Sequence, residues 1–205
     1  MLSKAIVNTD TETLIKSAAK NVFLKKGLAG TRMQEIANLA GIGRTALHYY
    51  FRRKEKLFQV VLKEAFRDLA KRTEMLRNSS YTTLEKMEAF VDGYFDKALA
   101  EPEIDIFMLN EFNNNPGVMR AILISEANGS PFDMLLNGIE TSVKKGEMKG
   151  APKQILITLI SMCVFSFAGR GIIQNVLFLS DEQYMVLMKE RKIYMKDFLK
   201  IAFKP

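Results

Sequence analysis

The chain has 205 residues, 48% of them hydrophobic, and one cysteine, Cys163, in an apolar run. This length allows one or two domains with a proper core, and a lone cysteine excludes an internal disulfide, which suits a reducing cytoplasm. The formal net charge of +7 is uneven: residues 1–72 carry 15 Lys and Arg against 6 Asp and Glu, whereas the other 133 residues carry 15 against 17. A basic N-terminal part on a nearly neutral remainder is typical of nucleic-acid binding.

A first helix is predicted to end near Gly27. Its apolar residues recur at helical spacing, Lys25 and Lys26 occupy its last turn, and glycine readily takes the left-handed conformation that ends a helix. The apolar stripe comprises Leu14, Ile15, Ala18, Ala19, Val22 and Phe23.

Residues 31–51 indicate two short helices joined by a tight turn at Gly41. Thr31, with Gln34 three positions on, has the T-x-x-Q form of a capping box, so we expect Thr31 to cap the first helix. Gly41 suits the left-handed position after that helix, and Gly43 is tolerated as the next N-cap.

The second short helix would bury Leu47 and Phe51 and present polar side chains on its other side. A short helix with a hydrogen-bonding outer face, held by a helix beneath it, has the shape that enters a DNA major groove. Arg44 opens this helix, and Arg is the usual partner of guanine O6 and N7. For His48 a base contact and a packing role both stay open. The candidate DNA-binding residues are Thr31, Arg32, Arg44, Thr45, His48, Tyr49, Tyr50, Lys54 and Lys56, of which Thr31, Lys54 and Lys56 are phosphate-positioning candidates.

The rest of the chain is predicted to be helical, because no segment alternates like a strand and breaks rich in Pro, Gly, Asn and Ser separate the periodic stretches. The fold class is therefore all-α, with about nine to ten helices. After the motif, the predicted helices are 54–77, 82–101, 103–114, 116–127, 131–146, 152–177 and 181–202.

Residues 9 to about 66 resemble the N-terminal domain of the TetR family of bacterial transcriptional repressors. The resemblance implies a three-helix helix-turn-helix DNA-binding domain at 9–66, with its motif at about 31–51, and a helical effector-binding and dimerisation domain at 67–205. It further implies a homodimer on a palindromic operator in double-stranded DNA, released by a small-molecule inducer. The residues that carry it are Phe23, Gly27 and Thr31, Ile36-Ala37, Ala40-Gly41-Ile42, Leu47, Tyr50-Phe51 and Lys54-Glu55-Lys56-Leu57.

The predicted helix after Pro152 is apolar nearly all round, which requires neighbours on every side. A twofold dimer would supply them and would set two recognition helices about one DNA turn apart. The candidate dimer contacts are Met134, Leu135, Ile139, Ile160, Val164, Phe167 and Gly171.

The resemblance also implies an inducer pocket lined by the middle helices. Methionine and aromatic residues are abundant there, which suits varied apolar or amphipathic guests but equally suits an ordinary core. Arg170 lies in the most apolar region, and its expected partners are, in order, a carboxylate across the dimer, solvent, and an acidic ligand. The candidate pocket residues are Phe90, Tyr94, Met108, Phe112, Met162, Phe165 and Arg170.

A small helical enzyme and a membrane-surface protein are the alternatives. The sequence has one histidine, no glycine-rich phosphate loop, no H-E-x-x-H and no nucleophile elbow, so we expect no catalytic residue, metal or cofactor beyond an unknown effector. The carboxylates around Pro102 (Glu101, Glu103, Asp105 and Glu111) are interpreted as a solvated helix face. The most apolar run, 155–169, is short of a membrane span and the N-terminus lacks a signal-peptide pattern, so no membrane partner and a bacterial cytoplasmic location are expected.

Overall fold

The computed structural model describes residues 2–77, 80–127 and 132–205, with side chains described for 10–67, 80–125 and 132–205. All regular secondary structure within these residues is helical. The eleven helices are α1 (Leu2–Gly30), α2 (Met33–Leu39), α3 (Arg44–Tyr50), α4 (Lys54–Arg77), α5 (Thr83–Ala100), α6 (Glu103–Asn114), α7 (Pro116–Ala127), α8 (Asp133–Lys144), α9 (Pro152–Ala168), α10 (Arg170–Leu177) and α11 (Asp181–Phe203).

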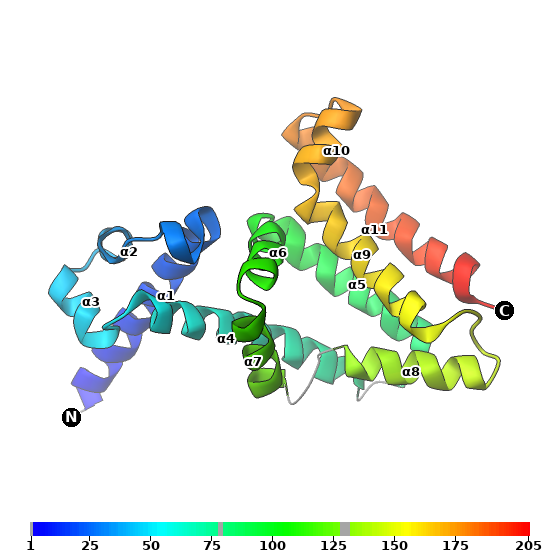
Figure 1. Ribbon diagram of the computed structural model, residues 1–205, viewed down its shortest axis with the longest axis horizontal. Coiled ribbons are helices and arrows are strands. Elements are labelled where there is room, and N and C mark those ends of the chain that lie inside the picture. The colour runs from blue at the N-terminus through cyan, green and yellow to red at the C-terminus, as the bar shows by residue number, and fades with distance from the viewer. Residues whose placement is uncertain (1, 78–79, 128–131) are drawn as a thin grey trace.

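Two groups of helices are joined by the long helix α4 (Figure 1). We call α1–α3 with the first half of α4 the head, and α5–α11 the body. In Figure 1 the head lies at one end of the molecule, α6 and α7 stand between the two groups, and α5, α9 and α11 run side by side at the other end. The predicted all-helical class is thus confirmed.

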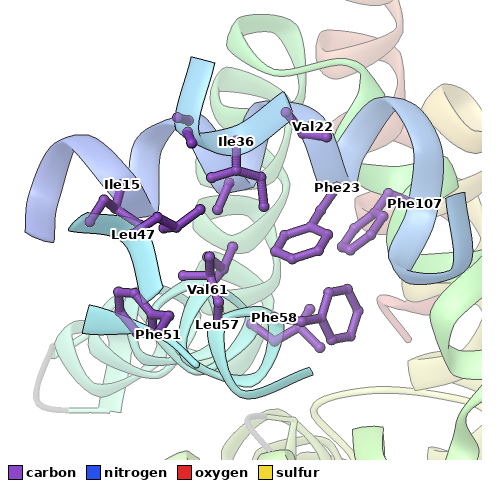
Figure 2. Packing of buried hydrophobic residues seen from close by; sticks show 14 of the residues in the cluster. Ile15, Val22, Phe23, Ile36, Leu47, Phe51, Leu57, Phe58, Val61 and Phe107 are labelled. Carbon is purple, nitrogen blue, oxygen red and sulfur yellow. The ribbon is translucent and has the colours of Figure 1, made fainter. Parts of the chain in front are cut away.

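The core of the head consists of side chains whose helical spacing predicted their burial. Ile15 and Phe23 of α1, Ile36 of α2 and Leu47 of α3 are buried together against Phe58 of α4 (Figure 2). Because α3 is only seven residues long, it depends on this packing rather than on its own hydrogen bonds for stability.

Glycines end the short helices of the head as predicted. Gly41 has a φ of 68°, and Gly43 is the N-cap of α3. Gly27, with a φ of 64°, interrupts α1, although helical turns resume up to Gly30. The prediction for Thr31 is wrong: α2 begins two residues later with Arg32 as its N-cap, and the Thr31 hydroxyl donates backward to the Gly27 carbonyl at 2.7 Å.

The core of the head continues into the body. Phe107 of α6 packs edge-on against Phe58 at 5.9 Å between ring centroids, and Figure 2 shows it beside Phe23. The ammonium group of Lys20 in α1 lies 2.6 Å from the carboxylate of Glu101, which ends α5. In addition, α1 packs on α6, and α4 packs on α7. The division at residue 66 stays a prediction, but the two parts share one packed surface.

A second core holds the body together. It is formed mainly by α5, α8, α9 and α11, with buried side chains such as Phe95, Ile139, Leu159 and Met195. Cys163 is fully buried in this cluster, which confirms its predicted place in the core.

The single predicted helix 152–177 is wrong, because the chain bends by 71° at Gly169 between α9 and α10. A Cβ on Gly169 would lie 2.7 Å from the Phe165 carbonyl oxygen and 2.9 Å from its ring, so only glycine fits this close approach. The bend produces the eleventh helix. None of the described helices is by itself long and apolar enough to cross a membrane; α9 and α10 pass that test of length and composition only as a bent pair.

Candidate nucleic-acid interface and effector region

The outer face of α3 is polar and exposed, as predicted. Leu47 points into the head core and is fully buried, while Arg44, Thr45 and Tyr49 on the other side are exposed, Tyr49 by 78%. A buried anchor beneath an exposed polar face leaves this helix free to contact another macromolecule while its backbone stays fixed.

Arg44 and His48 are neighbours on that face. The Nε of Arg44 donates to Nε2 of His48 at 3.5 Å, a weak contact across one helical turn. His48 is half-buried, as is Tyr50, whose ring packs edge-on against that of Tyr49 at 5.4 Å. Tyr50 is therefore the more buried of the two tyrosines, as the sequence predicted.

Two of the predicted phosphate contacts have their polar groups engaged inside the head; the prediction is wrong for buried Thr31 and stays a prediction for half-buried Lys54. The Nζ of Lys54 donates to the carbonyls of Leu28, Ala29 and Thr31 at 2.9, 3.3 and 3.2 Å. These carbonyls lie at and just after the end of α1, where helical partners are missing, so the ammonium group completes that helix end. The side chain of Thr31 is 2% exposed.

Other cations are available at the same surface. Lys56 is exposed as predicted, and so is Arg32 before α2. Sequence reasoning missed Arg52 and Arg53, which are both exposed between α3 and α4. These two arginines directly follow the recognition helix in the sequence, and this basic pair could have indicated them as DNA contacts.

The residues predicted to line an effector pocket do not gather in one place. Phe90, Tyr94 and Met162 belong to the core of the body. Met108 packs instead against the core of the head. The structure therefore groups the first three in one cluster and places Met108 in another.

Phe112 and Phe165 both lie at the surface, and their place in an effector pocket stays a prediction. Phe112 contacts Phe66 of α4, with ring centroids 6.1 Å apart. Phe165 is 53% exposed on α9. A hollow of about 920 Å³ does occur where the end of α1, the start of α4 and α6 meet, but none of the seven predicted residues lines it.

Arg170 has partners within its own chain, which the sequence analysis did not predict; the three expected kinds of partner stay predictions. Its guanidinium group lies 2.8 Å from Asp181 Oδ1 and donates from Nε to Gln174 at 3.2 Å. It also lies over the ring of Tyr184, 4.9 Å from the centroid. Hydrogen bonds from Gln174 and Arg170 lower the pKa of Asp181. Arg170 thus ties the start of α10, just after the bend at Gly169, to the start of α11.

The carboxylates around Pro102 are not all solvated. Asp105 is 8% exposed and Glu111 is 5% exposed, which overturns the interpretation as a solvated face for these two. Asp105 Oδ1 accepts a hydrogen bond from the Tyr94 hydroxyl, whereas its buried Oδ2 has no partner among the described residues. Burial raises the pKa of Asp105 to about 6, although the Tyr94 hydrogen bond opposes the rise.

Three of the predicted dimer contacts are wrong because they are buried in the body core of their own chain; these are Leu135, Ile139 and Phe167. The other four, Met134, Ile160, Val164 and Gly171, keep some exposed surface and stay predictions. Sequence reasoning missed the apolar side chains that are exposed. They are Ile157 and Phe165 on α9, Ile172, Val176 and Leu177 on α10, Phe178 after it, and Val186, Ile193, Tyr194 and Ile201 on α11.

Similarity to known proteins is strongest in the head. Residues 15–61 match the family model described as "Bacterial regulatory proteins, tetR family". A 50-residue segment is 48% identical to the HTH-type transcriptional regulator RutR of Escherichia coli strain K12, and it covers 24% of each chain. The match thus spans about a quarter of the length of that relative.

Two further matches extend into the body. The HTH-type transcriptional repressor NicS of Pseudomonas putida is 26% identical over 172 residues, which cover 81% of this chain and 79% of NicS. The structure of the transcriptional regulator FadR from Bacillus subtilis in complex with stearoyl-CoA has a TM-score of 0.67 at 16% identity, covering 91% of this chain and 96% of FadR. The matched head, residues 15–61, is thus a TetR-type helix-turn-helix domain, and over most of its length the chain is similar to helix-turn-helix transcriptional regulators.

Proposed function

We propose that this protein is a ligand-responsive transcriptional repressor that binds a palindromic operator as a homodimer in the bacterial cytoplasm. The observation that carries the proposal is the exposed polar face of α3 above fully buried Leu47, in a head that matches the TetR family. The name of NicS describes a repressor, which supports the same role here.

In this proposal α3 lies in the major groove. Arg44, the first residue of the helix, reaches a guanine edge, with Thr45 and Tyr49 beside it. Lys56, Arg52 and Arg53 contact the phosphates on either side and set the register of the helix without reading sequence.

The dimer is proposed to form through α9, α10 and α11. Their exposed apolar side chains, with Ile157, Phe165 and Ile193 among them, form a surface that a monomer would leave in water. A second copy related by a twofold axis covers this surface with its own and places two α3 helices on two half-sites. Ile193→Glu is expected to shift the protein toward monomer in sedimentation, whereas Val118→Glu, on the exposed side of α7, is a matched control. A wild-type monomer that binds one half-site as tightly as a palindrome would contradict the dimer.

Effector response is proposed to pass through the surface shared by head and body. A ligand can change DNA affinity only if it binds better to the form whose α3 spacing does not fit the operator. The solved FadR structure contains stearoyl-CoA, so this fold can hold a small molecule.

Selection of bound duplexes from a random pool tests the proposal. A recovered palindrome with half-sites about one DNA turn apart supports a dimeric repressor. Transcription from a promoter that carries this palindrome is then measured with and without the protein. Recovery of duplexes without common sequence, or higher transcription in the presence of the protein, would contradict the proposal.

A further inference from the structure

Asp105 of α6 is a buried carboxylate that has no ion-pair partner among the residues whose side chains the structure describes. Its side chain is more than nine-tenths buried, Oδ1 is taken by the Tyr94 hydroxyl, and Oδ2 is orphaned among the described residues. Buried charges are ordinarily paired or fully hydrogen-bonded, because removing them from water is otherwise costly. The question is therefore which group donates a hydrogen bond to Asp105 Oδ2.

The nearby cations already have other partners. Arg191 of α11 donates its Nε to Ser166 Oγ at 2.7 Å and makes no ion pair with Asp105 in the described part of the chain. Arg170 is bound to Asp181, and Lys97 lies 2.6 Å from Glu101. None of these cations therefore donates to Asp105 Oδ2 within the described part of the chain.

A row of aromatic rings runs beside this carboxylate. The Tyr94 ring, whose hydroxyl holds Asp105, lies 5.9 Å from Phe90 and 6.3 Å from Phe167 between centroids. Phe90 in turn lies 5.8 Å from Phe132. Aromatic faces attract organic cations, and the combination of several rings with a carboxylate is suited to an ammonium group on an apolar body.

The row can adapt to a guest. Tyr94 is partly exposed, so one edge of the row reaches the surface. Met87 and Met162 belong to the same cluster, and methionine side chains repack readily around irregular shapes.

We propose that the effector of this regulator is an amphipathic organic cation whose ammonium group donates to Asp105 Oδ2 and whose apolar part lies along Phe90, Tyr94 and Phe167. The proposal deepens the proposed function and rests on it for the consequence of binding, but not for the site itself. It replaces the expectation of an anionic guest at Arg170, because that guanidinium group is already paired and a carboxylate guest would meet the like charge of Asp105.

The experiment compares three probes of one chain length on the full-length protein: octylamine, 1-octanol and octanoate. Titration calorimetry at pH 8, where the amine is protonated and Asp105 is ionised, gives the three affinities. Octylamine is expected to bind at least tenfold more tightly than 1-octanol, with octanoate weakest. Asp105→Asn is expected to remove the preference for octylamine and to leave 1-octanol unchanged. Glu103→Gln, an exposed carboxylate on the same helix, is the matched control and should behave like wild type.

A second measurement needs no variant and covers the case in which Asp105→Asn does not fold. At pH 5 the preference of the wild-type protein for octylamine over 1-octanol should shrink, because Asp105 is then largely protonated. The three other acidic groups named in this cluster have pKa values above this window, because burial raises the pKa of Cys163 and of Tyr184 to about 12 and raises that of Tyr94 as well.

The outcomes are distinct. The proposal is overturned if octylamine does not bind at millimolar concentration, if 1-octanol or octanoate binds as tightly, or if Asp105→Asn keeps the preference. Release of operator DNA by octylamine from wild type but not from Asp105→Asn supports both the site and the proposed function. Asp105-dependent binding of octylamine with no change in DNA affinity supports the cation site and contradicts the effector response in the proposed function.

Discussion

Replacing Asp105 by Asn should change how stability depends on pH. Folding raises the pKa of this carboxyl from an ordinary value of 3.8 to about 6, with burial as the main cause. The folded protein therefore holds this proton more tightly than the unfolded chain, so the contribution of Asp105 is most favourable below pH about 4 and is lost as pH rises through about 6. Each pKa unit corresponds to about 1.36 kcal/mol, so about 3 kcal/mol is lost across this window.

An amide at position 105 cannot ionise, and it can still accept the Tyr94 hydrogen bond. The free energy of unfolding of Asp105→Asn minus that of wild type should therefore be about 3 kcal/mol larger at pH 8 than at pH 4. For a chain of this size that corresponds to a rise in Tm of roughly 10 °C. Thermal melts followed by circular dichroism at pH 4 and pH 8 measure the difference, with Glu103→Gln as the control. Melting temperatures of wild type and Asp105→Asn that change in parallel with pH would refute the argument, because burial of the charge would then have no energetic consequence.

The other predictions concern the head and the bend. Arg44→Ala should cost about 1–3 kcal/mol of DNA binding per half-site and relax base preference at one symmetric position, which duplex selection with the variant checks. Lys56→Ala should lower the slope of log K for DNA binding against log salt by about one unit per subunit without changing Tm. Lys54→Met should instead reduce stability by about 1.5–3 kcal/mol, because it loses the bonds to backbone carbonyls. An equal effect of the two substitutions on Tm would contradict this distinction. Gly169→Ala should cost about 1–3 kcal/mol in urea unfolding because its Cβ would overlap Phe165, while Gly171→Ala, with open space at its Cβ, should be neutral or slightly stabilising.

Local patterns predicted most of the helices. The bounds of α4, α6 and α7 match the predicted ranges. Of these, α6 and α7 begin beside Pro102 and Pro116, whose effect on the backbone is local. The turn at Gly41 and the burial of Leu47 likewise depend only on residues a few positions away.

The errors share a different cause, which is contact between residues far apart in the sequence. Lys54 caps carbonyls more than twenty positions earlier, and no local pattern distinguishes it from Lys56 two residues on. Asp105 has the same sequence surroundings as exposed Glu103, yet the helical turn places it against α5, where Tyr94 meets it. The bend at Gly169 was hidden because an isolated glycine in an apolar run is compatible with a straight helix.

The arrangement of α6 relates the proposed cation site to the DNA-binding head. Asp105 and Phe107 are two residues apart, so they lie on nearly opposite sides of the helix: one faces Tyr94 in the body, and the other lies in the head core beside Phe58. A ligand that enters beside Asp105 must displace side chains of α5 or shift α6, because the body core is filled by its own residues. A shift of α6 cannot leave Phe107 in place, and Phe58 belongs to α4, whose first residue, Lys54, holds the end of α1. On the proposed mechanism, the short path from Asp105 through Phe107 to Phe58 carries a displacement of α6 to α4, the helix that supports the head.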